Sequence, residues 1–326
     1  MSESWAAVFP GQGSQHTGMG KDFFENFNIA KQTYEEASDS LKLDLKRLCF
    51  EGSDQDLKLT ANTQPALLVT SIAAWRVFTS ECEFRPTVTL GHSLGEYSAL
   101  VASEAMTLNE AIVTVRIRGQ AMQDAVPVGT GAMMAVLGLD DASVIKACSD
   151  MQNKAATDGG LKNCVLEAAN FNSPGQVVVS GHQKALDYMK EHLIASDYGA
   201  SRAKMIPLSV SAPFHCSLMK PAAERLKSQL EKVQWQKQMK FAVIHNVNAE
   251  KNHDGTLAKT LLFEQMTKPV LWTSSVRHTG VNKYLEFGAG RVLAGLIKKT
   301  DLTAHTFNID TVENLKNTMQ HLEDGA

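Results

Sequence analysis

Apolar residues in the first third of the chain form short β-prone runs that alternate with longer helix-prone runs. The runs 5–9 and 86–90 are short and predict buried strands, whereas 65–78 and 108–122 have the length of helices. A further strand is expected late in the chain, at 283–287. Strands that alternate with helices are typical of a parallel sheet covered by helices, so the pattern predicts an α/β fold.

The rhythm changes after a glycine-rich break at 127–131. The following segments read strand, helix, strand, strand, helix and strand, at 132–137, 140–151, 164–169, 176–180, 184–195 and 203–208. This order is that of a ferredoxin-like unit. We therefore expect a small ferredoxin-like subdomain at 129–206, inserted into a large α/β subdomain made of 1–128 and 207–326.

Composition excludes several classes of protein. The chain of 326 residues is 44% hydrophobic and 21% charged, with a formal net charge of −3, which gives no global electrostatic case for binding nucleic acid or a membrane surface. No apolar stretch has the length of a membrane span, and the first residues lack the features of a signal peptide. The five cysteines and ten histidines show neither C-x-x-C nor metal-ligand spacing. We expect a cytoplasmic monomer without a metal or cofactor.

The most informative motif is Gly91-His-Ser-Leu-Gly95, which follows the strand expected at 86–90 and precedes a helix that begins near Leu94. A G-x-S-x-G sequence between a strand and a helix is typical of a nucleophile elbow, which exposes one serine hydroxyl at a helix N-terminus. The motif predicts acyl transfer through an acyl-Ser93 intermediate. It leaves open whether the acceptor is water, an alcohol or a thiol.

A serine nucleophile needs a base that accepts its proton. Spacing alone does not choose among the ten histidines. A third group should orient the imidazole of that base, and the sequence pattern does not identify it either.

Several motifs together resemble the malonyl-CoA:acyl carrier protein transacylases and the related acyltransferase domains of polyketide synthases. The matching segments occur in the family's order at 9–13, 91–95, 118–122, 131–135, 169–181, 211–219, 268–272 and 286–290. The resemblance implies an α/β hydrolase-like core with a ferredoxin-like insert. It also implies transfer of a malonyl group from malonyl-CoA to the phosphopantetheine thiol of holo acyl carrier protein, by way of a malonyl-serine, in fatty acid synthesis.

The resemblance assigns roles to individual residues. Ser93 is the expected nucleophile and His215 the expected base. No Asp or Glu matches a triad acid, so a backbone carbonyl is expected to hold the imidazole, and the matching position is Gln265. The expected oxyanion hole consists of the backbone N–H groups of Gln12 and Leu94, the latter as in other elbow enzymes.

Arg118, Phe214 and Gln265 are the residues expected at the substrate. Arg118 lies in the family's R-G-x-x-M pattern, and a guanidinium grips a carboxylate with two parallel hydrogen bonds. Arg116 is two positions away on the same expected helix, cannot share its face and is interpreted as a structural or solvated charge. In the family, Phe214 before the histidine and an aliphatic residue after the serine accompany a preference for malonyl over methylmalonyl groups.

Other functions remain as alternatives. A serine esterase or thioesterase would use the same elbow, release its product to water and place an acidic residue behind the base. A trans-acting acyltransferase of a polyketide pathway would share every motif. A non-catalytic protein that docks a carrier domain would not need an activated nucleophile. An acidic carrier protein also predicts a basic patch near the cleft, for which Arg202, Lys204 and Lys220 are candidates by position.

Overall fold

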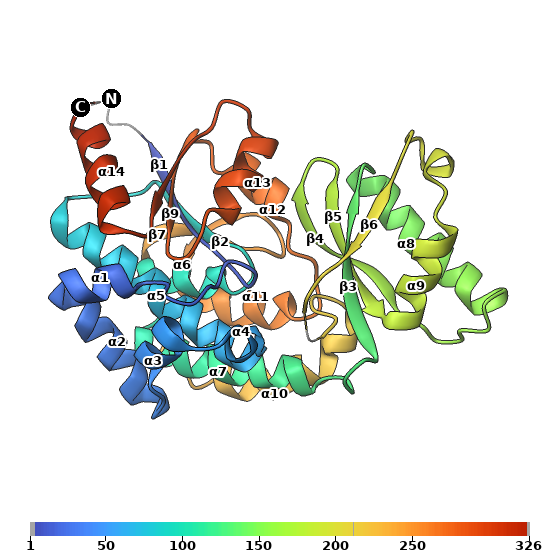
Figure 1. The fold of residues 1–326 in the computed structure, drawn as a ribbon, viewed down its shortest axis with the longest axis horizontal. Helices are drawn as coiled ribbons and strands as arrows, with labels where there is room; N and C mark the ends of the chain where they lie inside the picture. The colour runs from blue at the N-terminus through green and yellow to red at the C-terminus, as the bar shows by residue number, and fades with distance from the viewer. Residues whose placement is uncertain (1–3, 211, 325–326) are drawn as a thin grey trace.

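A sheet of parallel strands, extended by one antiparallel strand, forms the larger part of the computed structural model (Figure 1), which describes residues 4–210 and 212–324. In spatial order the strands are β10 (His305–Ile309), β9 (Lys283–Phe287), β1 (Trp5–Phe9), β2 (Val88–Gly91), β7 (Gln238–Ile244) and β8 (Lys251–Asp254). Only β8 runs antiparallel to its neighbour. The expected strands at 5–9 and 283–287 are β1 and β9.

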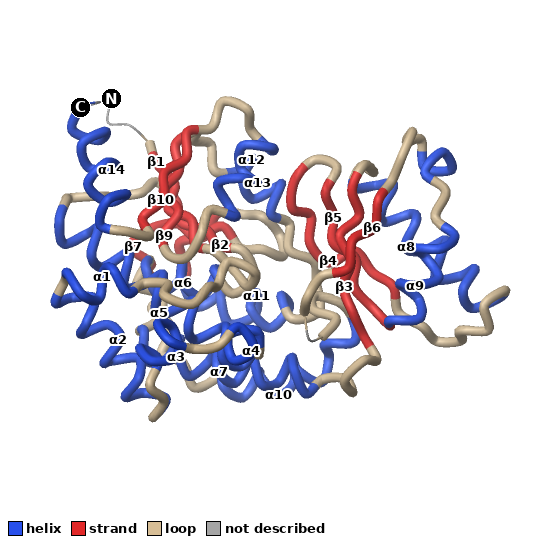
Figure 2. Tube along the Cα trace, viewed as in Figure 1, coloured by secondary structure: helices blue, strands red, loops and turns tan. Residues whose placement is uncertain are grey.

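Helices cover both faces of this sheet, as the tube view shows (Figure 2). The helices of the larger part are α1 (Lys21–Asn26), α2 (Asn28–Leu41), α3 (Leu45–Glu51), α4 (Asp54–Lys58), α5 (Thr60–Glu81), α6 (Gly95–Ala102), α7 (Leu108–Asp124), α10 (Lys220–Leu230), α11 (Ala258–Gln265), α12 (Trp272–His278), α13 (Val292–Thr300) and α14 (Val312–Asp324). The side chains of alternate residues in β1 point to opposite faces of the sheet. Ala7 and Phe9 join the core that contains α5, whereas Ala6 and Val8 join the core of α12 and α13.

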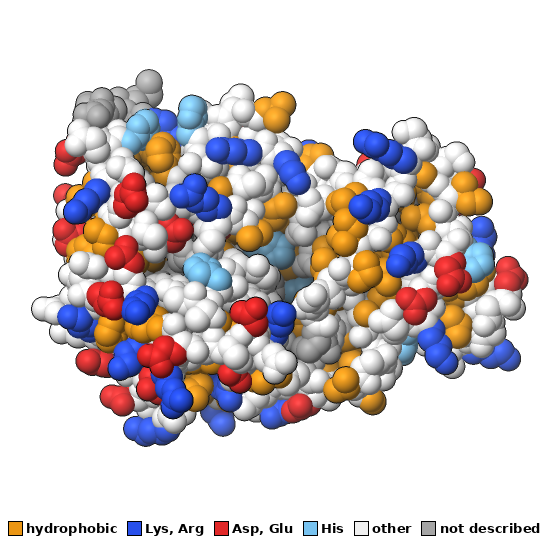
Figure 3. All heavy atoms as spheres, in the orientation of Figure 1, with side chains coloured by type: hydrophobic (Ala, Val, Ile, Leu, Met, Phe, Trp, Pro, Cys, Tyr) orange, Lys and Arg blue, Asp and Glu red, His pale blue; other side chains and the backbone are white. Residues whose placement is uncertain are grey.

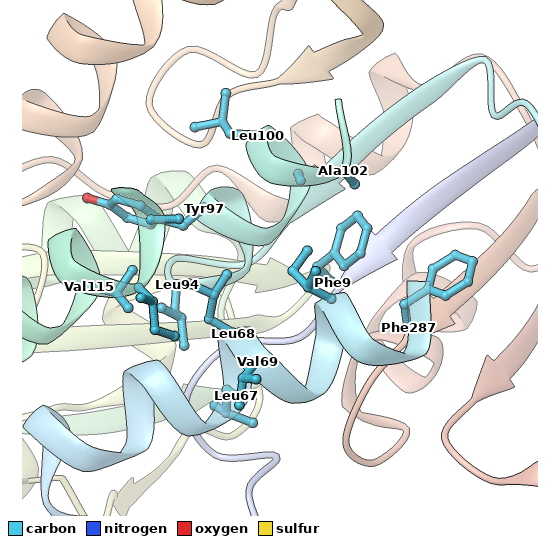
Figure 4. Close-up of a cluster of buried hydrophobic side chains, with 14 of the residues drawn as sticks. Phe9, Leu67, Leu68, Val69, Leu94, Tyr97, Leu100, Ala102, Val115 and Phe287 are labelled. Atoms are coloured by element: carbon cyan, nitrogen blue, oxygen red, sulfur yellow. The ribbon is translucent and has the colours of Figure 1, made fainter. Parts of the chain in front are cut away.

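The long helix α5 is buried along most of its length because it packs under the sheet. Its Leu68 is fully buried near Phe9 of β1 and Leu94 at the start of α6 (Figure 4). Its run 66–78 is apolar apart from Thr70, Ser71 and Arg76, which is typical of a buried position. The elbow between β2 and α6 therefore rests on a densely packed base.

The second sheet has four antiparallel strands, in the order β4 (Leu166–Ser173), β5 (Gln176–His182), β3 (Gly131–Leu137) and β6 (Lys204–Pro207). Helices α8 (Asp141–Thr157) and α9 (Gln183–His192) pack on it with a core of its own. The strand order and the two helices are those of a ferredoxin-like unit, so the predicted fold class is confirmed. The division of the chain at residues 129 and 206 stays a prediction.

Some element bounds differ from the expectation. The strand expected at 164–169 begins later and runs to Ser173, because it pairs with β5 almost to the turn at Pro174-Gly175. The helix expected at 184–195 ends at His192, since the next residue has extended backbone. Short 3₁₀ turns follow at Ala195–Tyr198, Ser217–Met219 and Gly255–Leu257.

A hollow separates the two parts on the face shown in Figure 3, and histidine side chains are visible on its floor. Beside it, strand β4 contacts the larger part directly. Asn170 pairs with Val270, and the Thr273 hydroxyl donates to the carbonyl of Phe171 at 3.0 Å. Among the described residues, no helix is both long and apolar enough to cross a membrane.

Candidate active site

Ser93 lies at the tip of a tight turn between β2 and α6. Its φ angle is 52°, a strained backbone conformation for a residue with a side chain. The flanking glycines permit the turn. A Cβ on Gly91 would lie 2.0 Å from the carbonyl of Gly95, and a Cβ on Gly95 would lie 2.0 Å from that of Phe9. The motif thus forms the predicted nucleophile elbow, packed against the end of β1.

The Ser93 hydroxyl is 2.8 Å from Nε2 of His215, although 122 residues separate them in sequence. On the other side of the ring, Nδ1 is 2.8 Å from the backbone carbonyl oxygen of Gln265. A carbonyl only accepts, so Nδ1 carries the proton and Nε2 is left to accept the serine proton. This is the serine–histidine pair, held by a backbone carbonyl, that the resemblance implied.

His215 is buried and itself has a positive φ of 56°. Burial, together with the nearby Arg118 guanidinium, lowers the pKa of His215 to about 3. The imidazole is therefore neutral at neutral pH, which is the form that accepts a proton. Glu167 of β4 fixes the chain just beyond it, because its carboxylate accepts from both the backbone N–H and the hydroxyl of Ser217. Ser211, which opens the matching motif around His215, lies outside the described residues.

Arg118 projects from α7 to the same point. One guanidinium nitrogen donates to Ser93 Oγ at 3.0 Å and to Gln265 Oε1 at 2.9 Å. The guanidinium is buried and stacks near the ring of Tyr97, 5.5 Å from its centroid. Its Nε has no hydrogen-bond partner among the described residues. A buried cation with unused donors, beside a serine hydroxyl, can bind an anionic group of a substrate.

Arg116, the other candidate arginine, is engaged elsewhere. It donates to the carbonyl of Ala61 and to the side chain of Asn62, each at 2.6 Å. This guanidinium ties α7 to the start of α5. It is a structural charge, one of the two interpretations considered for it.

The loop at 10–13 lies against the elbow. A Cβ on Gly11 would be 2.3 Å from the carbonyl oxygen of His92, so only glycine permits this approach. The backbone N–H groups of Gln12 and Leu94 make no hydrogen bond within the described part of the chain. Both are candidates to donate to an oxyanion formed at Ser93.

Phe214 precedes His215 and is 6% exposed, within the large core. His92, the neighbour of Ser93 in the motif, turns away from the serine. Its Nε2 lies 2.8 Å from Oδ1 of Asn172, and its ring packs near Trp272. His92 therefore links the elbow to β4 and does not pair with Ser93.

Three buried polar residues around this group were not singled out by the motifs: Glu96, His245 and Asn246. Asn246 follows β7, the strand beside β2, and a side chain at the carboxyl end of a neighbouring parallel strand is a recognisable signal. Glu96 also had a signal, since it is the one charged residue in the apolar run that forms α6.

The chain resembles known proteins over nearly its whole length. The family profile described as acyl transferase domain matches residues 7–287. The chain belongs to the acyl transferase family. It is 43% identical to the malonyl CoA-acyl carrier protein transacylase of Bacillus subtilis (strain 168), over 98% of this chain and 97% of that protein. It is also 43% identical to the enzyme of that name from Escherichia coli (strain K12), over 93% and 96% of the two chains.

Solved structures show the same likeness. The crystal structure of an acyl carrier protein S-malonyltransferase from Vibrio cholerae superposes with a TM-score of 0.89 at 42% identity, covering 97% of this chain and all of that one. A type II polyketide synthase acyl carrier protein in complex with its malonyl-transacylase gives a TM-score of 0.89 at 39% identity, covering 98% and 100%. The predicted membership of this acyl transferase family is confirmed.

Proposed function

We propose that this acyl transferase moves a malonyl group from malonyl-CoA to the phosphopantetheine thiol of acyl carrier protein, as a step of fatty acid synthesis. The observation that carries the proposal is the convergence of Ser93, His215 and Arg118 at one point, with one guanidinium nitrogen 3.0 Å from the serine oxygen. A nucleophile beside a buried cation suits a thioester that bears a free carboxylate. The relatives named as malonyl transacylases support the same substrate.

In the first half-reaction, His215 Nε2 takes the proton of Ser93 Oγ as the oxygen attacks the thioester carbonyl of malonyl-CoA. The backbone N–H groups of Gln12 and Leu94 donate to the resulting oxyanion. The tetrahedral intermediate collapses, the carbon–sulfur bond breaks, and the proton on His215 passes to the leaving CoA sulfur. The product is malonyl-Ser93 with neutral His215.

In the second half-reaction, the thiol of holo acyl carrier protein gives its proton to His215 and attacks the malonyl-Ser93 ester. The carbon–oxygen bond then breaks and Ser93 recovers the proton. Throughout, Arg118 pairs with the malonyl carboxylate, which would otherwise be buried without a partner at a cost of several kcal/mol. These steps use side chains and backbone of the chain itself.

The partner is an acidic carrier protein, and Arg202, Lys204 and Lys220 are exposed positions suited to meet it. A solved relative is described in complex with an acyl carrier protein, which supports a partner of this class. We further propose that the enzyme works as a monomer in the cytoplasm and has no nucleic-acid partner. Sedimentation velocity of the purified protein, alone and with holo carrier protein, tests whether the enzyme is a monomer.

Hydrolysis is the main competing function. It predicts an acidic residue behind the base, whereas the proposal uses the carbonyl of Gln265 in that position. Intact-mass measurement after mixing with malonyl-CoA separates the two. We expect a malonyl adduct that persists without carrier protein, discharges when holo carrier protein is added, and is absent in Ser93→Ala. Rapid release of free malonate without carrier protein would favour the hydrolase, and an adduct retained in Ser93→Ala would exclude Ser93 as the nucleophile.

A further inference from the structure

Glu96 is fully buried three residues after the nucleophile, on the first turn of α6. Its carboxylate accepts three N–H groups: His245 Nδ1 at 2.7 Å, the Asn246 backbone at 2.9 Å and Gln265 Nε2 at 2.8 Å. Buried carboxylates are costly unless they are hydrogen-bonded in this way. The backbone N–H of Glu96 donates to the carbonyl of Ser93 at 3.2 Å, but its carboxylate makes no hydrogen bond to Ser93, His215 or Arg118 in the described structure. The position of this buried carboxylate beside the three side chains therefore needs another explanation.

Gln265 explains the position of Glu96, because this one residue contacts both His215 and the guanidinium of Arg118. Its backbone oxygen accepts from His215 at 2.8 Å, and its side-chain Oε1 accepts from Arg118 at 2.9 Å. Its Nε2 faces the opposite way and donates to Glu96 and, at 3.1 Å, to the carbonyl of Ser93. Gln265 therefore spans the three reacting groups at the end of α11.

The carboxylate of Glu96 accepts the shortest hydrogen bond of the Gln265 NH₂ group and, together with the Ser93 carbonyl, sets which way the amide faces. A carboxylate accepts hydrogen bonds only, so the NH₂ group must point to Glu96, which leaves Oε1 for Arg118. A flipped amide would set two donors against each other at the guanidinium and two acceptors against each other at Glu96. The negative charge also favours the charged form of Arg118 without occupying its donors, which stay available to a substrate carboxylate.

We propose that Glu96 is a positioning residue for acyl transfer. It acts through Gln265, which keeps the side chains of His215 and Arg118 in position beside Ser93. The inference rests on the proposed malonyl transfer and adds to it a residue outside the reacting group. In Glu96→Ala the Gln265 NH₂ group loses its charged acceptor and its shortest hydrogen bond and keeps only the longer contacts to Ser93 and Asn246. Both His215 and Arg118 then have a less firmly held partner. Misplacement of catalytic groups by about 1 Å can cost about a hundredfold in rate.

The experiment measures single-turnover acylation of Ser93 by intact mass, with malonyl-CoA and acetyl-CoA over a range of concentrations. Rates are divided by the fraction of enzyme that is finally acylated, which removes any loss of folded protein. For Glu96→Ala we expect the maximal rate to fall at least about tenfold with both substrates, through His215. We expect the half-saturating concentration to rise only for malonyl-CoA, because only malonyl has a carboxylate for Arg118. A merely structural role would not raise the half-saturating concentration for malonyl-CoA while leaving that for acetyl-CoA unchanged.

Two further variants identify the cause. Glu96→Gln keeps an acceptor for Gln265 and Asn246, and His245 can accept from the new NH₂ in its other tautomer, so its rates should stay within about threefold of wild type. Ser98→Ala is the matched control on α6, since the Ser98 hydroxyl is buried and has no partner among the described residues. It should acylate at the wild-type rate.

A double-mutant cycle with Gln265→Met tests the route, because methionine removes the side-chain amide and keeps the backbone carbonyl. Gln265→Met alone should lower the maximal rate with both substrates and raise the half-saturating concentration for malonyl-CoA only, as Glu96→Ala does. Adding Glu96→Ala to Gln265→Met should lower the acylation rate by less than a further factor of about three. Wild-type acylation by Glu96→Ala, or equal losses in both backgrounds, would overturn the inference. If Glu96→Ala does not fold, wild-type acylation by Gln265→Met overturns it. Failure of the wild-type enzyme to form any malonyl adduct would instead reject the proposed function.

Discussion

The side chain of Asn246 holds the backbone on both sides of Ser93. Its Oδ1 accepts the backbone N–H of Ser93 at 2.7 Å, and its Nδ2 donates to the carbonyl of Gly91, also at 2.7 Å. The two contacts bracket the strained residue of the elbow, whose φ is 52°. Because the turn is strained and Asn246 is fully buried, this amide contributes to the conformation that presents the hydroxyl.

Asn246→Ala should therefore reduce both stability and acylation. It leaves two backbone groups unpaired in the interior, at a cost of about 1–3 kcal/mol each, and lets the Ser93 hydroxyl leave its position beside His215. Urea denaturation and the single-turnover rate of malonyl loading measure the two effects. Asn248→Ala is the control, since Asn248 is exposed on the same loop and should lose less than about 0.5 kcal/mol. Equal stability of the two variants would show that the elbow holds without Asn246.

Arg118→Ala should change substrate preference more than it changes catalysis. The malonyl carboxylate loses its partner, whereas an acetyl group never had one, so the specificity for malonyl-CoA over acetyl-CoA should fall by about a hundredfold or more. The ratio of kcat/KM values measures this. Arg116→Ala lies on the same helix and removes a charge that binds Ala61 and Asn62, so it should leave the ratio unchanged. Equal losses for the two substrates in Arg118→Ala would favour a hydrolase with no use for a carboxylate.

Phe214→Ala should relax discrimination against a branched acyl group. The phenyl ring is buried immediately before His215, and an α-methyl group needs space that the ring is expected to fill. One methyl group in an apolar pocket is worth about 1–3 kcal/mol, so the preference for malonyl-CoA over methylmalonyl-CoA should drop by about 10-fold to 200-fold. Competition between the two substrates, read as the ratio of adduct masses on Ser93, provides the measurement. An unchanged ratio would mean that Phe214 does not line the acyl site.

The parts of the fold that the sequence predicted are those with a local signal. Strand β1 and helix α5 are runs rich in apolar residues, and the elbow around Ser93 has glycines at its turn. Each occurs where the pattern indicated. Strands β7, β8 and β10 were not anticipated. In β7 the alternation is short, with exposed Gln238 and Lys240 against buried Met239 and Phe241, and the rest is an apolar run. Such a run does not by itself distinguish a strand from a buried helix.

The buried polar contacts could not be derived from spacing. Gln265 lies 172 residues after Ser93, with which it shares a hydrogen bond, and Glu96 lies 149 residues before its partner His245. Such pairs form because β2 and β7 are neighbours and because α11 ends beside them, which is a property of topology. His215 and Gln265 were found through the family resemblance, and Glu96 and Asn246, which no motif marked, emerged only from the structure.

From the low pKa of His215 we predict how both activity and stability depend on pH. Burial is the larger cause of the shift and the charge of Arg118 the second, so removing the guanidinium should raise this pKa toward its ordinary value. With acetyl-CoA as substrate, the acid limb of kcat/KM should therefore lie at higher pH in Arg118→Met than in wild type. An acid limb at the same pH in both enzymes would show that the charge of Arg118 does not act on the base.

The same shift links folding to pH. The folded enzyme holds His215 at a pKa of about 3 and the unfolded chain at its ordinary value of 6.5, so between these values the unfolded state binds the proton more strongly. The contribution of neutral His215 to the free energy of unfolding is complete above pH 6.5. It is lost as the pH falls toward 3. Between about pH 7.5 and about pH 5, wild type should lose about 2 kcal/mol more than His215→Asn, whose amide does not titrate. Urea denaturation of both proteins at the two pH values measures the difference, and parallel losses would mean that His215 titrates normally in the folded enzyme.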